Sequence, residues 1–352
     1  MLTEFRAVNS LGLQRLAALR LVGERCAGPA EAAAWLGCAQ GQDLPGVLES
    51  IALRTVSGSV DEVRAAFDEG RLVRSWPMRG TLHVVAAEDL AWMLPLGTPR
   101  PLAAAAQRRG GLGLTDATIE RAGEVAAEVL RGGGRRTRAE LIACWAEAGL
   151  DLASSRGYHT LAVLCQRGLL VQGPFADPRD TEQTGEHADR GARPSAKEQA
   201  FVLLDEWVPE PRRLGREEAL AEWARRFFRS HGPADRKDLA RWTGIPAADV
   251  TTAIDGARDD LVETDGRLHD PATPDRLAAA DDPGAELLLP GFDEFVLGYA
   301  DRSQVLDPEH ADRICPGNNG IFRPTIVRDG QVVGTWAWKG SGKNRRVERG
   351  PF

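Results

Sequence analysis

Two glutamines separated by one glycine are the residues of this sequence best suited to chemistry by hydrogen bonding. The stretch 40–43 reads Gln40, Gly41, Gln42, Asp43 and follows a helical segment that opens after Pro29. A buried carboxamide needs partners for both its oxygen and its amino group, so it packs poorly in a core. We therefore expect a polar group opposite the glutamines. The alternative is a plain turn in which Gly41 bends the chain, Asp43 caps the next helix and the glutamines are solvated.

Composition limits the class of protein. A chain of 352 residues has room for two or three domains. Its net charge of −7 argues against a protein that coats nucleic acid over its whole surface, so DNA binding would need a local basic face. The five cysteines are dispersed and form no CxxC pair, which favours a reducing compartment over a disulfide framework. Without an apolar run of signal-peptide or membrane-spanning length, we expect a soluble, cytoplasmic monomer.

Motifs for bound cofactors are missing from the sequence. The six histidines show no metal-ligand spacing such as HExxH, and no glycine-rich phosphate loop follows a predicted strand. We therefore expect no metal, nucleotide or redox cofactor.

Helices followed by a short strand or hairpin occur three times along the chain, which is the order of a winged helix. The first set has helices at 11–22, 29–36, 45–53 and 60–67, followed by strands within 72–76 and 81–85. The second has helices at 115–130, from a Thr137/Glu140 capping box through Ala146, and from a Ser154–Ser155 cap to Gly168, then a strand at 169–171. The third has helices at 201–207, 217–228, 233–242 and 247–257, then a hairpin turning at Asp265–Gly266.

The predicted fold is α+β, with tandem winged-helix (helix-turn-helix) modules and a C-terminal β-rich region. The predicted boundaries are a first module at 1–105, a second at 106–173, an exposed loop at 174–198, a third module at 199–280 and the β region at 281–352. In the β region, Asp329–Gly330 is a strong hairpin turn signal.

Two stretches could contact phosphates. The end of the chain, 339–349, holds five basic residues and one acid and is either a solvated tail or a phosphate-binding edge. Arg156, Tyr158 and His159 open the second module's recognition-like helix and are either phosphate contacts or a solvated helix start. Winged helices also mediate protein contacts, so the repeats alone leave DNA binding open.

Landmarks along nearly the whole chain resemble the winged-helix DNA glycosylase family typified by AlkZ and YcaQ. They are Gln40-Gly41-Gln42-Asp43 with Leu53-Arg54, the block 72–83 with Met78-Arg79-Gly80-Thr81-Leu82-His83, the run Leu288 to Glu294 with Gly298-Tyr299 and Asp301-Arg302, and Asp329-Gly330 with Gly334-Thr335-Trp336.

The resemblance implies a monofunctional enzyme that hydrolyses the N-glycosidic bond of N7-alkylated guanine in double-stranded DNA, including bulky natural-product (genotoxin) adducts. The family's catalytic pair is Gln-x-Gln or His-x-Gln, which makes Gln40 and Gln42 the catalytic candidates in an AlkZ-like branch. The middle residue is usually apolar and here is Gly41. The role implied is base excision repair or antibiotic self-resistance.

Uncharged amides suffice for this chemistry because N7 alkylation already makes the purine cationic and a good leaving group. The protein needs only to hold a water under C1′ and to stabilise an oxocarbenium-like sugar, which carboxamide oxygens can do. Asp43 caps a helix or helps to orient the water or sugar.

Further residues are expected around this chemistry. Arg79, Thr81 and His83 are expected to support the catalytic pair without taking part in the chemistry. The alternative is that His83 is a satisfied structural group and Thr81 only fills the strand. A shallow site reached from the minor groove is predicted where the Gln40 turn meets the strand pair 79–83. Five more residues complete the DNA-binding set with Tyr158 and His159: Arg54, Arg156, Lys343, Arg345 and Arg346.

Two other functions remain open from the sequence. One is a glycosylase that unhooks interstrand crosslinks, and the other is a non-enzymatic winged-helix regulator that senses a small molecule. The identity of the lesion is not encoded in any of these landmarks.

Overall fold

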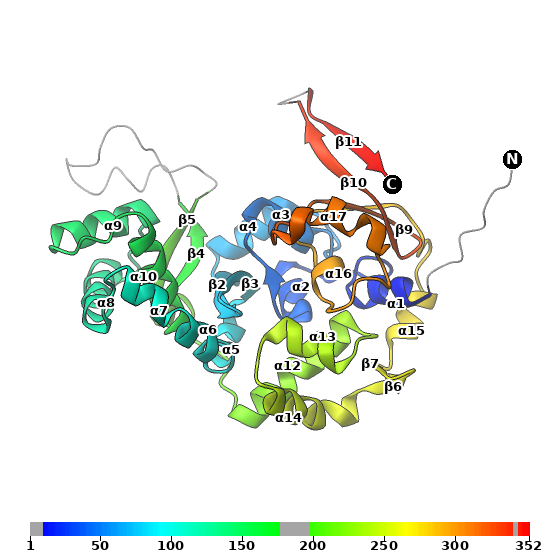
Figure 1. Ribbon diagram of the computed structural model, residues 1–352, viewed down its shortest axis with the longest axis horizontal. Coiled ribbons are helices and arrows are strands. Elements are labelled where there is room, and N and C mark those ends of the chain that lie inside the picture. The colour runs from blue at the N-terminus through cyan, green and yellow to red at the C-terminus, as the bar shows by residue number, and fades with distance from the viewer. Residues whose placement is uncertain (1–9, 177–197, 341–343) are drawn as a thin grey trace, which may run out of the picture. The chain divides into compact units, whose positions relative to one another are not determined.

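The computed structural model describes residues 10–176, 198–340 and 344–352, and these form two compact units (Figure 1). The first unit comprises Met1–Val60 and Gly215–Phe352, and the second comprises Asp61–Leu214. The predicted first module, 1–105, thus contributes to both units. The five-part division made from the sequence stays a prediction, and the predicted loop 174–198 lies almost wholly outside the described residues.

The helical part of the first unit is built around α12. The helix α12 packs against α14 and α2, and α1 packs against α15. Its core holds the large buried side chains of Trp223, Phe227, Trp242 and Tyr299. The helices are α1 (Ser10–Ala18), α2 (Pro29–Leu36), α3 (Leu44–Ala52), α12 (Arg216–His231), α13 (Arg236–Thr243), α14 (Ala247–Ala257), α15 (Thr273–Ala278), α16 (Glu294–Leu297) and α17 (Ala311–Ile314).

The helix-turn-helix pair and the hairpin predicted for the third module are present in this unit. Asp235 closes a capping box at the start of α13, and Gly244 ends that helix in the left-handed conformation, with φ of 72°. The strands β6 (Val262–Thr264) and β7 (Arg267–His269) then form the predicted hairpin, with Asp265 and Gly266 both at positive φ in its turn.

The C-terminal region of the first unit is an antiparallel sheet in the order β11-β10-β9-β8. Its strands are β8 (Leu287–Leu289), β9 (Thr325–Arg328), β10 (Gln331–Lys339) and β11 (Arg346–Pro351), and β10 and β11 run side by side as a ribbon (Figure 1). The predicted turn at Asp329–Gly330 joins β9 to β10, with both residues at positive φ. The solvated-tail interpretation of 339–349 was wrong, because residues 346–351 pair with β10 along their length.

The second unit combines a twisted sheet with helices. Strands β2 (Leu72–Met78), β3 (Thr81–Ala86), β4 (Leu170–Phe175) and β5 (Gln199–Leu203) lie in the order β3-β2-β4-β5. The helices are α4 (Val60–Asp68), α5 (Leu90–Gly97), α6 (Pro99–Ala104), α7 (Ala106–Gly111), α8 (Asp116–Leu130), α9 (Arg138–Glu147), α10 (Ser155–Gln166) and α11 (Leu204–Trp207).

Local signals in this unit were correct where a cap or turn decides the structure. Thr137 and Glu140 form the predicted capping box. Ser154 precedes α10 but its side chain caps nothing, so that prediction was wrong. The helix predicted over 201–207 begins only at Leu204, because residues 199–203 are buried and pair with β4. The predicted α+β class with a C-terminal β region is confirmed.

A buried ion pair fastens α3 to the segment before α16. Arg54 is fully buried, and its two terminal nitrogens donate to the two oxygens of Asp293 at 2.9 and 3.0 Å. The Ser50 hydroxyl donates to Asp293 at 2.7 Å. Breaking such a pair from one side leaves an uncompensated buried charge.

We expect Arg54→Met to lower the free energy of unfolding by about 3–5 kcal/mol, because it strands the Asp293 carboxylate in the core. Urea unfolding followed by tryptophan fluorescence measures the change. The matched control is Arg258→Ala, which removes an exposed ion pair to Glu263 in the same unit and should cost less than about 1 kcal/mol. Equal losses in the two variants would contradict the role given to the buried pair.

Candidate active site

The glutamine turn lies at the surface of the first unit. After α2 ends at Gly37, which has φ of 78°, the chain forms the short strand β1 (Ala39–Gln40). Gln40 is half-buried and Gly41 buried, whereas Gln42 is exposed. The Gln42 side chain is therefore accessible at this surface, and the Gln40 side chain is partly so.

The side-chain oxygen of Gln40 is the notable atom of the turn. Gln40 Oε1 is buried and has no hydrogen-bond partner among the described residues. A buried acceptor without a donor costs about 1–3 kcal/mol, so it is rarely retained without a use. The atom is suited to accept a hydrogen bond from a water or a substrate group.

The backbone of the same residue is firmly held. The Gln40 N–H donates to Glu294 Oε1 at 3.0 Å, across 254 positions of sequence. The other oxygen of Glu294 accepts from the Trp242 indole at 3.0 Å and lies 3.3 Å from His231 Nε2. A buried carboxylate, two helices and the glutamine turn thus form one network.

Asp43 stands at the N-cap position of α3 without acting as a side-chain cap. Its carboxylate accepts no hydrogen bond from the first turn of the helix, so the capping role predicted for it was wrong. The side chain is exposed and lies over Gly46, where an added Cβ would come within 2.6 Å of Asp43 Oδ2 and 3.2 Å of the Gly291 carbonyl oxygen. Gly46 therefore lets this corner pack closely.

Arg54 does not belong to the DNA-binding set. Its side chain is fully buried and engaged by Asp293 and Ser50, so it presents no surface to a phosphate. The prediction failed because an arginine close to the glutamines in sequence was assumed to share their surface.

The C-terminal ribbon carries exposed positive charge next to an aromatic ring. Arg345 and Arg346 are exposed, and the Arg345 guanidinium lies 3.9 Å from the centre of the exposed Trp338 ring. Lys343 lies outside the described residues. Burial raises the pKa of Glu49 on α3, while the charge of Arg345 opposes that rise and the charge of Asp43 adds to it. Arg345 on the ribbon and Asp43 at the turn therefore both lie close enough to Glu49 to affect its pKa.

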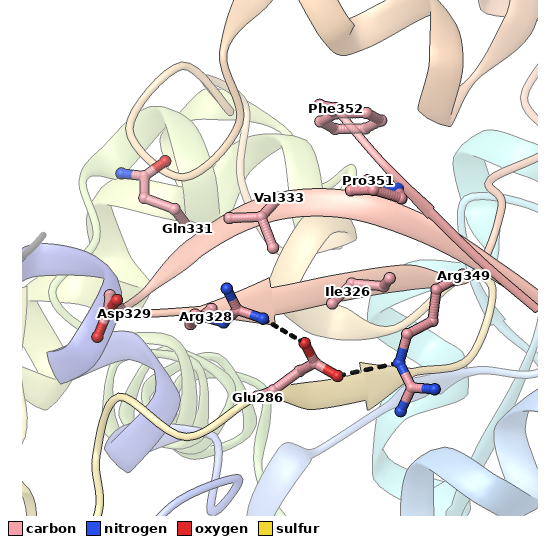
Figure 2. A pocket seen from close by; sticks show the side chains of 9 residues that line it. All are labelled: Glu286, Ile326, Arg328, Asp329, Gln331, Val333, Arg349, Pro351 and Phe352. Atoms are coloured by element: carbon pink, nitrogen blue, oxygen red, sulfur yellow. Dashed lines mark hydrogen bonds and ion pairs between the residues drawn. The ribbon is translucent and has the colours of Figure 1, made fainter. Parts of the chain in front are cut away.

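A cavity of about 410 Å³ lies on the C-terminal sheet, and Glu286 in its lining is paired with two arginines of the same lining. Figure 2 shows Glu286 between Arg328 and Arg349, with distances of 2.5 and 3.2 Å to their nitrogens. Hydrogen bonds from these two arginines lower the pKa of Glu286. The carboxylate therefore ties β11 to β9 and the start of β8, and it neutralises the arginines of the cavity.

The three support residues predicted in the second unit form a local cluster. Arg79 and Gly80, both at positive φ, make the turn between β2 and β3. Arg79 Nη2 donates to His83 Nε2 at 3.0 Å, which leaves His83 Nδ1 to donate to the Thr81 carbonyl oxygen at 2.9 Å. His83 is fully buried, and these two hydrogen bonds hold it within the turn. The Gln40 turn belongs to the other unit, and a shared site stays a prediction.

The opening of α10 forms a basic surface with a helix that the sequence did not single out. Arg108 on α7 donates to His159 Nε2 at 2.9 Å. Arg156 pairs with the exposed Asp151 at 3.1 Å, and Tyr158 packs edge-on against Trp76. Burial, followed by the charges of Arg108 and Arg109, lowers the pKa of His159.

Four functional residues were not assigned roles from the sequence. Asp293 and Glu294 were noted only as landmarks, although two consecutive acids inside the apolar run 287–297 signal buried carboxylates that need partners. Arg108 and Arg109 adjoin each other in a stretch left without an assignment, and their paired charge was the available signal.

Neither a metal-binding cluster nor a membrane-spanning helix is found in the described part of the chain. Among these residues, no three histidine, cysteine or acidic side chains cluster in a way that could hold an ion. Of the helices described, none has the length and apolar character to cross a bilayer.

Comparison with known proteins identifies the family of the chain. The model of the family described as "DNA glycosylase AlkZ-like" matches residues 33–352. A curated relative from Streptomyces sahachiroi, named "Interstrand DNA cross-link repair glycosylase", is 27% identical over 303 residues, which cover 82% of this chain and 76% of that protein. The solved structure of Streptomyces sahachiroi DNA glycosylase AlkZ shares the fold with a TM-score of 0.76 and 22% identity, covering 98% of this chain and 90% of that one.

The chain is therefore a DNA glycosylase, a hydrolase of N-glycosyl bonds that acts on DNA. It belongs to the AlkZ-like DNA glycosylase family, as the resemblance predicted. The alternative of a non-enzymatic regulator was wrong.

We expect DNA binding to draw a proton onto His159. A phosphate beside it would offset the charges of Arg108 and Arg109 that lower its pKa, so the pKa rises on binding and affinity increases as pH falls from about 8 to about 6. Fluorescence anisotropy with undamaged duplex measures this slope.

His159→Gln should flatten the pH dependence, whereas the control His310→Gln in the other unit should retain it. A slope unchanged in His159→Gln would remove this helix start from the DNA-binding surface.

Proposed function

We propose that this glycosylase hydrolyses the N-glycosidic bond of N7-alkylated guanine in duplex DNA, including bulky genotoxin adducts, with Gln40 and Gln42 as its catalytic residues. Its role would be base excision repair or self-resistance to a DNA-alkylating natural product. The alkylated purine carries a positive charge, so it leaves as a neutral base with the electron pair of the C1′–N9 bond. Protonation of the leaving group by the enzyme is unnecessary.

The reaction then needs a nucleophile and a stabilised sugar. Water adds its oxygen to C1′ as the C1′–N9 bond breaks, and the water's proton passes to solvent. The Gln40 oxygen would accept a hydrogen bond from that water, and the exposed Gln42 carboxamide would direct its dipole at the oxocarbenium-like sugar. Asp43, exposed and not engaged as a helix cap, would add a favourable negative charge.

One observation carries this proposal: Gln40 Oε1 is a buried acceptor without a partner, on a turn whose backbone is anchored by Glu294. An acceptor held at a fixed place is what positions a water without reorganisation during the reaction. Membership of a glycosylase family supports assigning that water to base excision.

DNA contacts would come from both units. In the first, Arg345 and Arg346 with Trp338 on the ribbon offer phosphate contacts and a stacking ring, and Lys343 would extend the same edge. In the second, Arg156, Tyr158 and His159 would bind phosphates, and Arg79, Thr81 and His83 would act as support.

Gln40→Ala and Gln42→Ala should each lower the single-turnover excision rate about 10²-fold, because each removes a preorganised hydrogen-bonding group. The assay uses duplex containing N7-methylguanine or a bulky N7 adduct, with alkaline cleavage of the abasic sites. Binding to undamaged duplex should persist in both variants.

The matched control is Gln331→Ala, a glutamine of the same unit whose side chain donates to the Gln304 carbonyl oxygen on the C-terminal sheet. It should excise at the rate of the wild type. Full activity in both Gln40→Ala and Gln42→Ala would refute the assignment of chemistry to this turn, and wild-type release no faster than spontaneous depurination would refute the proposed substrate.

A second candidate function is the unhooking of interstrand crosslinks. The observation in its favour is the name of the curated Streptomyces sahachiroi relative, an interstrand cross-link repair glycosylase. A crosslink joined through N7 of guanine carries the same positive charge on the purine, so the same turn could release it.

We expect a duplex crosslinked through N7 to be unhooked at a rate within about tenfold of the matching monoadduct, because the electrophile at C1′ is the same in both. Denaturing gel electrophoresis separates crosslinked from unhooked strands. Efficient release of the monoadduct with an intact crosslink would confine the enzyme to monoadducts.

A further inference from the structure

Glu294 receives hydrogen bonds from two elements distant in sequence. The residue is 1% exposed, and its two oxygens face the Gln40 backbone N–H and the Trp242 indole N–H, each at 3.0 Å. His231 Nε2 lies 3.3 Å from the second oxygen, and its other ring nitrogen lies 2.7 Å from Ser230 Oγ. A carboxylate accepts at both oxygens and offers no donor, so it matches this arrangement.

The turn it holds has little stiffness of its own. Gly37 and Gly41 flank the short strand on its two sides, and glycine has more backbone freedom than any other residue. The Gln40 carboxamide oxygen, with no partner in the described chain, contributes no restraint. The orientation of that side chain therefore depends on the backbone contacts of the strand, and the hydrogen bond to Glu294 is one of them.

Asp293, next to Glu294, holds the chain that follows the glutamine turn. Asp293 binds Arg54 and Ser50 on α3, the helix that follows the turn. The backbone of the loop also approaches closely, since an added Cβ on Gly46 would lie 3.2 Å from the Gly291 carbonyl oxygen. The segment 291–294 therefore contacts both Gln40 at the start of the turn and the helix α3 that follows it.

We infer that Glu294 is a positioning residue for excision: its carboxylate orients the peptide of Gln40 so that the glutamine oxygen meets the attacking water. This inference rests on the proposed function of Gln40. It assigns Glu294 no contact with DNA, so the rate of the chemical step should depend on it and the affinity for DNA should not.

The test is Glu294→Gln, which preserves shape but turns a donor toward either the Gln40 N–H or the Trp242 indole. We expect the single-turnover rate on N7-methylguanine duplex to fall about 10-fold to 10²-fold, the scale of a small misplacement of a reacting group. The dissociation constant for the same duplex should be unchanged. The exposed Glu309→Gln in the same unit is the matched control.

The double variant Glu294→Gln with Trp242→Phe separates positioning from simple stability. Removing the indole donor lets the new amide oxygen accept from the Gln40 N–H while its amino group donates to His231 Nε2. We expect the double variant to recover at least about tenfold in rate over Glu294→Gln alone, although it has lost one more hydrogen bond. Thermal melting of each variant reports the folded fraction.

The outcomes are distinct. Loss of rate at constant affinity with recovery in the double variant supports the inference. A wild-type rate in Glu294→Gln, when Gln40→Ala is impaired, overturns it, as does a loss that only follows the unfolded fraction and is not recovered. Gln40→Ala with full activity would instead overturn the proposed function.

Discussion

Two adjacent buried carboxylates, Asp293 and Glu294, are the constraint on which the candidate site depends. Burying a carboxylate is costly unless cations or strong donors meet it, so each acid requires a particular set of partners. Asp293 takes its partners from α3 and Glu294 takes its partners from the Gln40 backbone, α12 and α13. One short segment thereby joins parts of the chain that lie up to 254 positions apart in sequence, and it anchors the corner at 40–43.

The charges and dipoles of that corner suit the proposed substrate, a purine that is already positively charged before its glycosidic bond breaks. The Arg54–Asp293 ion pair that shapes the corner is buried, whereas the Gln42 carboxamide and the Asp43 carboxylate are exposed and Gln40 is half-buried. Neutral dipoles and one negative charge favour a sugar that becomes cationic as a positively charged purine leaves. For the proposed cationic purine, a strong general acid is unnecessary.

An acidic protein must bind DNA through local basic surfaces, and we propose one such surface in each unit. On the ribbon, Arg345 stacks on Trp338, which combines positive charge with an exposed aromatic ring. At the start of α10, Arg108 donates to His159, and burial together with the charges of Arg108 and Arg109 lowers the pKa of that imidazole. Other arginines are paired with acids, as Arg328 and Arg349 are with Glu286, so the net charge says little about where DNA would lie.

The sequence by itself determined whatever depends on near neighbours. Pro29 opens α2, Thr137 and Glu140 form a capping box, and Asp329–Gly330 turns a hairpin, because a cap or turn acts within four residues. The family landmarks likewise predicted the fold and the enzyme class. Tertiary structure alone decided that 199–203 is a strand, that Arg54 is a buried anchor and that Glu294 holds Gln40, since each depends on pairing with distant segments that no local pattern records.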